Sequence, residues 1–154
     1  MRALPLLLLL PVAAPAAALP PETVLMAENA AERAFQEKYG YADAVIAGDT
    51  IYLSGVVAGV APGETTLVPA YERAFARLDK ILARAGVTWA DVVEITSFHT
   101  DVKTQLDAMA AVKNRYIKPP FPAWTAIGVS RLLPDTGITE IKIIARKPAL
   151  PAAK

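Results

Sequence analysis

The segment from Pro120 to Arg146 constrains the fold most, because it combines alternating side chains with a clear turn. It predicts two strands that form a hairpin through a turn at residues 134–137. Residues two apart share a face of a strand, so Ile141 lies on one face of the last strand and Glu140 on the other. Trp124 likewise faces away from its neighbour Thr125. We expect Trp124 and Glu140 to lie together on a sheet face that no helix covers, and we expect the functional site there.

The first 18 residues have the pattern of a secretory signal peptide. Arg2 precedes an apolar run centred on residues 6–10, and Ala16–Ala18 offer a small-residue cleavage site before Leu19. The run contains prolines and is shorter than the roughly 20 residues that a membrane span needs. We therefore expect a cleaved leader and a periplasmic or secreted protein without a membrane anchor. Residues 19–40 are expected to form a linker and a short helix, 41–147 one domain, and 148–154 a tail.

Charge and composition exclude several function classes. The chain has 16 Lys+Arg and 15 Asp+Glu, and loss of the leader removes Arg2, which leaves a formally neutral domain. A neutral domain gives no electrostatic reason to expect nucleic-acid binding. The sequence has no cysteine and only one histidine, His99, which excludes a disulfide framework, a thiolate nucleophile and a multi-histidine metal site. Nucleotide-binding fingerprints are absent as well, so we expect neither a metal nor a cofactor.

The order of elements predicts an α+β two-layer sandwich. Residues 66–85 form the clearest helix, with apolar side chains at spacings of three and four, and residues 28–38 and 103–117 are further helix candidates. Strands are expected at 41–47, 50–57 and 91–100, followed by the two strands of the C-terminal segment. The main domain then reads β-β-α-β-α-β-β. Right-handed crossovers place its two long helices on one face of a single sheet.

Three polar residues have both a functional and a structural interpretation. Lys113 lies among apolar residues of a helix, so it either extends along its stem to solvent or points into a polar pocket. His99 ends a strand, where a partly solvated imidazole is the simpler interpretation. Glu140 is either a solvated acid on an exposed strand face or a member of a site.

Five segments resemble the Rid family, the RidA/YjgF-like proteins that are often labelled L-PSP endoribonucleases. They are YADAVIAGDTIYLSG at 41–55, LARAGV at 82–87, DVVEITSFHTDV at 91–102, FPAWTAIGVSRLLP at 121–134 and TEIKIIA at 139–145. The resemblance implies a chorismate-mutase-like fold and a homotrimer. It also implies ligand clefts between subunits, built from the sheet face opposite the helices.

The resemblance also assigns site positions. Tyr41, Ser54, Gly55 and Glu140 match the family in residue type, with Glu140 as the catalytic residue and the others binding substrate. Lys113 stands at the position of a helix asparagine. Trp124 stands where deaminating members have an arginine that holds the substrate carboxylate bidentately.

The family reaction is hydrolysis of imines or enamines such as 2-iminobutanoate or 2-aminoacrylate to a keto acid and ammonia. We expect an exported trimer that binds a small molecule, with deaminase activity weakened or altered because the arginine is lost. Trp124 suits stacking on a flat or apolar ligand, or packing at the centre of a trimer. The alternative is a non-catalytic trimeric ligand-binding or chaperone-like module. A ribonuclease ranks last, because the domain is neutral and has no pair of histidines.

Overall fold

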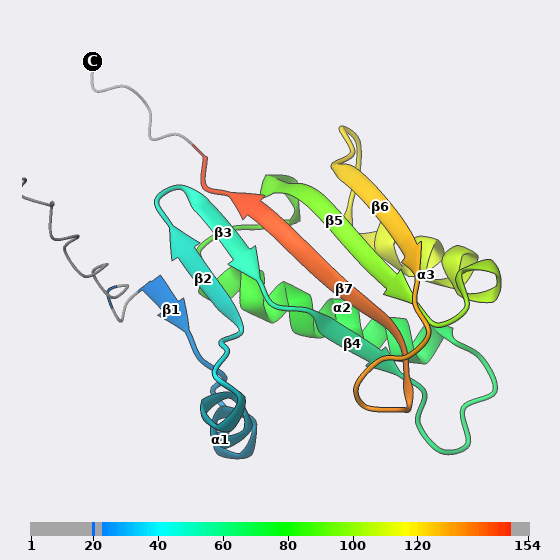
Figure 1. Ribbon diagram of the computed structural model, residues 1–154. Coiled ribbons are helices and arrows are strands. Elements are labelled where there is room, and N and C mark those ends of the chain that lie inside the picture. The colour runs from blue at the N-terminus through cyan, green and yellow to red at the C-terminus, as the bar shows by residue number, and fades with distance from the viewer. Residues whose placement is uncertain (1–19, 21–22, 149–154) are drawn as a thin grey trace, which may run out of the picture.

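The computed structural model describes residue 20 and residues 23–148, so the expected leader at 1–18 and residues 149–154 of the tail lie outside the described residues. The chain forms one sheet in the order β1-β2-β3-β7-β5-β6, and β4 continues β3 along β7 (Figure 1). The strands are β1 (Val24–Leu25), β2 (Ala44–Ala47), β3 (Thr50–Leu53), β4 (Val56–Gly59), β5 (Val92–His99), β6 (Ala123–Gly128) and β7 (Gly137–Arg146).

Two long helices, α2 (Val68–Arg84) and α3 (Val102–Tyr116), cover one face of this sheet (Figure 1). This arrangement confirms the expected α+β two-layer architecture. The shorter α1 (Ala30–Tyr39) lies at the edge, near β1 and β2, and a 3-10 turn at Trp89–Asp91 precedes β5. We call the sheet face under α2 and α3 the helix face and the other the open face.

The apolar stripe of α2 supplies more of the buried core than any other single helix or strand. Tyr71, Phe75 and Leu78 have no exposed surface, and they pack against apolar side chains that point down from β3, β5 and β7. Each such side chain stabilises the fold by about 1.5–3 kcal/mol through burial. The stripe follows from the helical repeat, because residues three and four apart share one side of a helix.

The segment before β2 is more regular than a linker. Val24 and Leu25 pair with β2, and Asn29 caps α1 by accepting from the backbone N–H groups of Ala31 and Glu32 at 2.9 and 3.2 Å. Gly40 ends α1 in the left-handed conformation, at φ 71°, which glycine adopts without strain. The chain therefore arrives at residue 41 in a fixed direction.

The expected strand at 50–57 is interrupted at Ser54 and Gly55. Tyr52 pairs with Ile144 and Val56 pairs with Ile141, so four steps along one strand match three along β7. One extra residue is thus accommodated, as in a β-bulge. The buried positions change accordingly from Ile51 and Leu53 to Val56 and Ala58. The interruption lies beside the candidate site.

The expected C-terminal hairpin is wrong. β6 pairs in parallel with β5 alone, whereas β7 runs antiparallel between β5 and the β3–β4 pair. The connection from β6 to β7 therefore crosses the end of β5 instead of forming a tight turn. The strand pairings, not the turn residues, set which side chains of this segment share a face.

Trp124 and Glu140 lie on opposite faces, which corrects the second expectation for this segment. Trp124 lies opposite Ile95, a fully buried core residue, and so points to the helix face. Glu140 lies opposite Phe98 and next to the buried Ile141, and so points to the open face. Both faces of β6 bear apolar side chains, so the alternation of residue types does not show which face points to the helices.

Candidate functional site

A cleft of about 880 Å³ opens where the β3–β4 interruption meets β7. It contains four of the six residues expected from the sequence: Tyr41, Ser54, Gly55 and Glu140. The aromatic rings of Phe35 and Tyr39, from α1, and the guanidinium of Arg77, from α2, complete its walls. The cleft thus combines an apolar wall with the carboxylates of Glu140 and Asp43 and one cation, Arg77, which lies 3.4 Å from Asp43, a composition suited to a small organic molecule.

Gly55 and Glu140 are fitted to each other. A Cβ atom on Gly55 would lie 2.0 Å from Glu140 Oε1, far inside any permitted contact. Only glycine therefore lets the carboxylate lie against the backbone of the β3–β4 interruption. Glu140 itself is half-buried, so this close approach fixes the position of its oxygens at the cleft surface.

Ser54 fixes the backbone rather than offering a free donor. Its hydroxyl donates to the carbonyl oxygen of Ala42 at 2.6 Å, and its backbone N–H donates to the carbonyl oxygen of Asp43 at 2.9 Å. Both bonds tie the interruption to the start of β2. A ligand can use only the lone pairs of the Ser54 hydroxyl, as acceptors.

Asp43 was not identified from the sequence. Its hydrogen bonds fix the backbone segment that carries Tyr41. Its carboxylate is buried and accepts from Gln36 Nε2 at 2.8 Å and from Arg84 at 3.0 Å. Gln36 in turn accepts from the backbone N–H of Ala27 at 2.7 Å. Tyr41 remains 42% exposed, with its ring edge-on to Phe35. The phenol therefore stands at the mouth of the cleft.

The other two expected residues form a second cluster on the helix face. Lys113 Nζ lies 4.7 Å from the centre of the Trp124 ring and 5.8 Å from that of Phe121. The lysine is only 7% exposed, so its ammonium group lies against these rings and does not extend to solvent. Burial lowers the pKa of Lys113 below its ordinary value.

A line of hydrogen bonds runs from Trp124 into the core. The indole N–H donates to Ser97 Oγ at 2.9 Å, and Ser97 Oγ lies 2.9 Å from His99 Nε2. His99 Nδ1 lies 3.1 Å from Thr139 Oγ1, which lies 2.8 Å from the hydroxyl of Tyr71. Tyr71 lies on α2, and its hydroxyl also lies 3.3 Å from the backbone carbonyl oxygen of Gln105 in α3, so the line joins β6, β5, β7 and both long helices.

His99 is therefore not the partly solvated imidazole that its place at a strand end suggested. It has no exposed surface, and burial lowers its pKa below 6.5 although its contact with Gln105 opposes the shift. Burial likewise raises the pKa of Tyr71, against the effect of Thr139. The sequence offered one signal for this network: the polar pair Ser97 and His99 shares a face with the apolar Ile95.

The sheet separates the two groups of expected residues within one chain. Glu140 and its neighbours face the open side, and Trp124 and Lys113 face the helix side. The six residues therefore do not form one pocket in a single chain. A ligand that contacts both groups needs a second copy of the chain.

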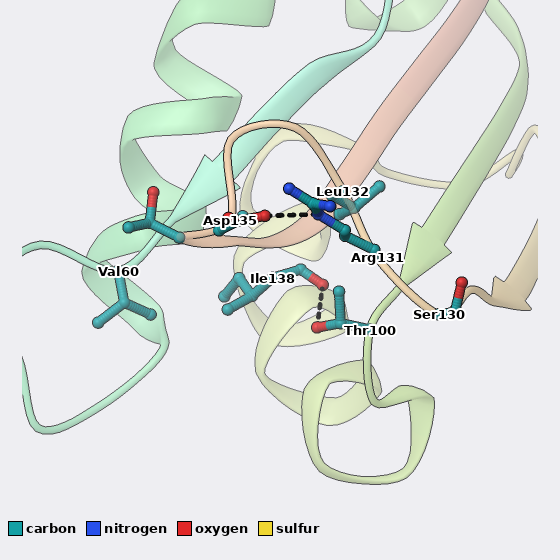
Figure 2. Close-up of a pocket in the computed structure, with 9 residues that line it drawn as sticks. Val60, Thr100, Ser130, Arg131, Leu132, Asp135 and Ile138 are labelled. Carbon is teal, nitrogen blue, oxygen red and sulfur yellow. Dashed lines mark hydrogen bonds and ion pairs between the residues drawn. The ribbon is translucent and has the colours of Figure 1, made fainter.

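A smaller depression lies at the end of β5, below the loop between β6 and β7 (Figure 2). Its volume is about 470 Å³. Arg131 and Asp135 form an exposed ion pair across the loop, with Nε 2.6 Å from Oδ1, and Thr100 donates to the carbonyl oxygen of Ile138. We place the candidate site at the larger cleft, because that cleft contains four of the residues expected from the sequence and this depression contains none of them.

Neither a membrane helix nor a metal cluster is found in residues 23–148. No helix there is long and apolar enough to cross a membrane. Nor does this part of the chain gather three or more His, Cys, Asp or Glu side chains that could bind a metal ion.

The fold and the cleft define an α+β protein with a site of small-molecule size beside a strand interruption. Residues 31–147 match the family model described as Endoribonuclease L-PSP. The chain belongs to this family, the RidA/YjgF-like or Rid family, as the resemblance of its motifs indicated.

Two relatives in sequence illustrate the range of the family. The RutC family protein YjgH of Escherichia coli strain K12 is 39% identical over 117 residues, which cover 72% of this chain and 86% of the relative. A protein named 2-iminobutanoate/2-iminopropanoate deaminase from Dermatophagoides farinae is 30% identical, over 68% of this chain and 83% of that protein.

Solved structures support the same fold. The structure of Protein YJGH is 34% identical and superposes with a TM-score of 0.68 over 83% of this chain and 97% of that one. Rv2704 of Mycobacterium tuberculosis, described as a member of the YjgF/YER057c/UK114 family, superposes with a TM-score of 0.69 at 22% identity, over 80% and 98% of the two chains. The second likeness concerns the fold alone.

Proposed function

We propose that this protein binds a small imine, enamine or flat apolar compound in clefts between the subunits of a homotrimer. The separation of the two clusters supports the proposal most directly, because only a second copy of the chain can bring Lys113 and Trp124 to a ligand at Glu140. The large cleft is open on one side in the single chain, as a cleft completed by a partner would be.

We further propose a weakened or altered imine deaminase activity. In this reaction a water adds across the C=N bond, and the resulting carbinolamine releases ammonia and leaves a ketone. Glu140, held against Gly55, is placed to accept the proton of the attacking water. The name of the mite relative supports this chemistry for the family.

Trp124 is the reason to expect a weaker or altered reaction. An arginine at this position would bind a carboxylate through two parallel hydrogen bonds. The indole instead donates its one N–H inward, to Ser97. Loss of a charged hydrogen-bond pair costs roughly 2–5 kcal/mol, which corresponds to a loss of 30-fold or more in rate or affinity.

Ammonia release from freshly generated 2-iminobutanoate tests the proposal. We expect slow release by the wild-type protein, a further loss of about 100-fold in Glu140→Gln, and a gain in Trp124→Arg. Glu94→Gln is the matched control, because Glu94 is an exposed acid on the open side of β5. If Glu140→Gln retains full activity, the catalytic role is wrong. If wild type and Trp124→Arg are both inactive, the non-catalytic binding module is the better description.

We also propose export, with cleavage before Leu19, on the pattern of residues 1–18. N-terminal sequencing of the protein from cell fractions tests this. Export predicts a chain that begins at Leu19 outside the cytoplasm. A chain that retains residues 1–18 in the cytoplasm would contradict it.

A further inference from the structure

Lys113 has an environment that is unusual for a surface helix residue. It lies in the last turn of α3 and is 7% exposed, and its ammonium group faces the rings of Trp124 and Phe121. Its ammonium group donates a hydrogen bond to the neighbouring Asn114, at 2.9 Å from Nζ to Oδ1. None of the ion pairs found within residues 23–148 includes Lys113.

The surroundings act on this amine in opposite directions. The end of a helix and the faces of aromatic rings favour a positive charge. Burial without a carboxylate disfavours it and lowers the pKa of Lys113. A larger share of Lys113 than of a solvated lysine is then the neutral amine, which is the nucleophilic form.

The rings of Trp124 and Phe121 differ in how firmly they are held. Trp124 is anchored through its N–H to Ser97, which belongs to the buried line of hydrogen bonds to His99 and Thr139. Phe121 lies in the connection between α3 and β6 and is 63% exposed. Trp124 is thus held from the core and Phe121 borders solvent, so a small molecule that reacts with Nζ would have to approach past Phe121.

We propose that Lys113 is a nucleophilic amine that forms an imine with small aldehydes or ketones. Its nitrogen adds to the carbonyl carbon, the oxygen takes up a proton, and loss of water leaves a C=N bond to Nζ. No oxidation or reduction occurs, and hydrolysis by the reverse path restores the lysine. The ring faces that border Nζ stabilise the protonated imine, which is a cation.

Imine formation at Lys113 would give the proposed deaminase a covalent intermediate. This use of the lysine rests on the proposed function. A substrate imine would transfer its carbon to Lys113 and release ammonia, and water would then release the ketone and the free amine. Nitrogen and proton counts balance, with one ammonia formed and one water consumed per turnover. Formation of the imine from a ketone requires no deaminase activity, so the two proposals can be tested apart.

Reductive trapping tests the amine directly. The protein is incubated with 2-oxobutanoate and sodium borohydride, and the modified peptides are mapped by mass spectrometry. The trapped product increases the mass by that of the ketone less one oxygen atom. We expect more adduct on Lys113 than on the exposed Lys118, since a lowered pKa raises the fraction of neutral amine.

Two variants serve as controls. Lys113→Arg keeps the charge without a trappable amine, and we expect it to lose the adduct, whereas Lys118→Arg, just beyond the end of α3, should keep it. An even distribution of adduct over exposed lysines, or none on wild-type Lys113, would overturn the proposal even if Lys113→Arg fails to fold. Adduct without ammonia release from 2-iminobutanoate would contradict the deaminase alone, and ammonia release without adduct would contradict the amine alone.

Discussion

The two clusters of candidate residues differ in how they are built. The cleft on the open side places its carboxylate through backbone geometry, because the strand interruption and a missing Cβ at Gly55 make room for Glu140. The cluster on the helix side places Trp124 and Lys113 through side-chain hydrogen bonds and ring contacts rooted in the core. Substitutions that change the backbone shape should therefore disturb the cleft at Glu140. Substitutions of buried polar groups should disturb the cluster of Trp124 and Lys113.

This difference separates activity from stability. Glu140 can be displaced without loss of core packing, since it lies on the sheet face that the helices leave open. Ser97 and His99 cannot be changed without leaving buried donors or acceptors unsatisfied, which costs about 1–3 kcal/mol per group.

Gly55→Ala should have the largest effect, a loss of about 100-fold in ammonia release, because the new methyl group displaces the Glu140 carboxylate from its place as a general base. Gly128→Ala is the matched control, since a Cβ there meets no atom within 4 Å. The melting temperature of both variants should change little. Equal activity in the two variants would show that the position of the carboxylate is unimportant.

Ser97→Ala should lower the free energy of unfolding by about 2 kcal/mol, since it leaves the Trp124 N–H and one His99 nitrogen without their partner. Thr96→Ala, one residue earlier and on the opposite face, should cost much less. Urea unfolding of both variants measures the difference. Similar losses would mean that the buried line of hydrogen bonds contributes little.

Lowering the pH should reduce the free energy of unfolding by a smaller amount, through protonation of His99. Because the pKa of His99 is lowered below 6.5 in the folded protein, the unfolded chain binds a proton more readily. Stability is therefore highest above pH 6.5 and falls as the pH drops below it, by at most about 1.4 kcal/mol per pH unit. Urea unfolding from pH 7.5 to 5.5 measures the slope. His99→Gln should flatten this part of the profile, and an unchanged slope would assign it to other groups.

The fold was predictable because its main signals are local and repeated. The stripe from Tyr71 to Leu82 determines α2, and the order of strands and helices determines the two layers. The pairing of β6 was not predictable from the turn at residues 134–137. That turn permits a hairpin, but the register of β5 with β7 places the last strand between β5 and β3 instead.

The site was predictable as a set of residues but not as two clusters. Family motifs identified Tyr41, Ser54, Gly55 and Glu140, and the structure brings these four together. The side of the sheet on which Trp124 lies depends on its pairing with Ile95, a contact between residues far apart in the chain. The burial of His99 likewise depends on Thr139 and Tyr71, which no spacing in the sequence connects to it.

The interruption between β3 and β4 also limits how the length of this chain can change. It holds one residue more than the facing stretch of β7. That extra residue determines which sheet face each later residue of β4 points to. Deletion of one residue there would restore an even ladder in which Val56 and Ala58 still point inward, but it would remove the irregular backbone against which Glu140 lies. Length variants of the protein are therefore expected in the loop at 60–66 and not at Ser54 or Gly55.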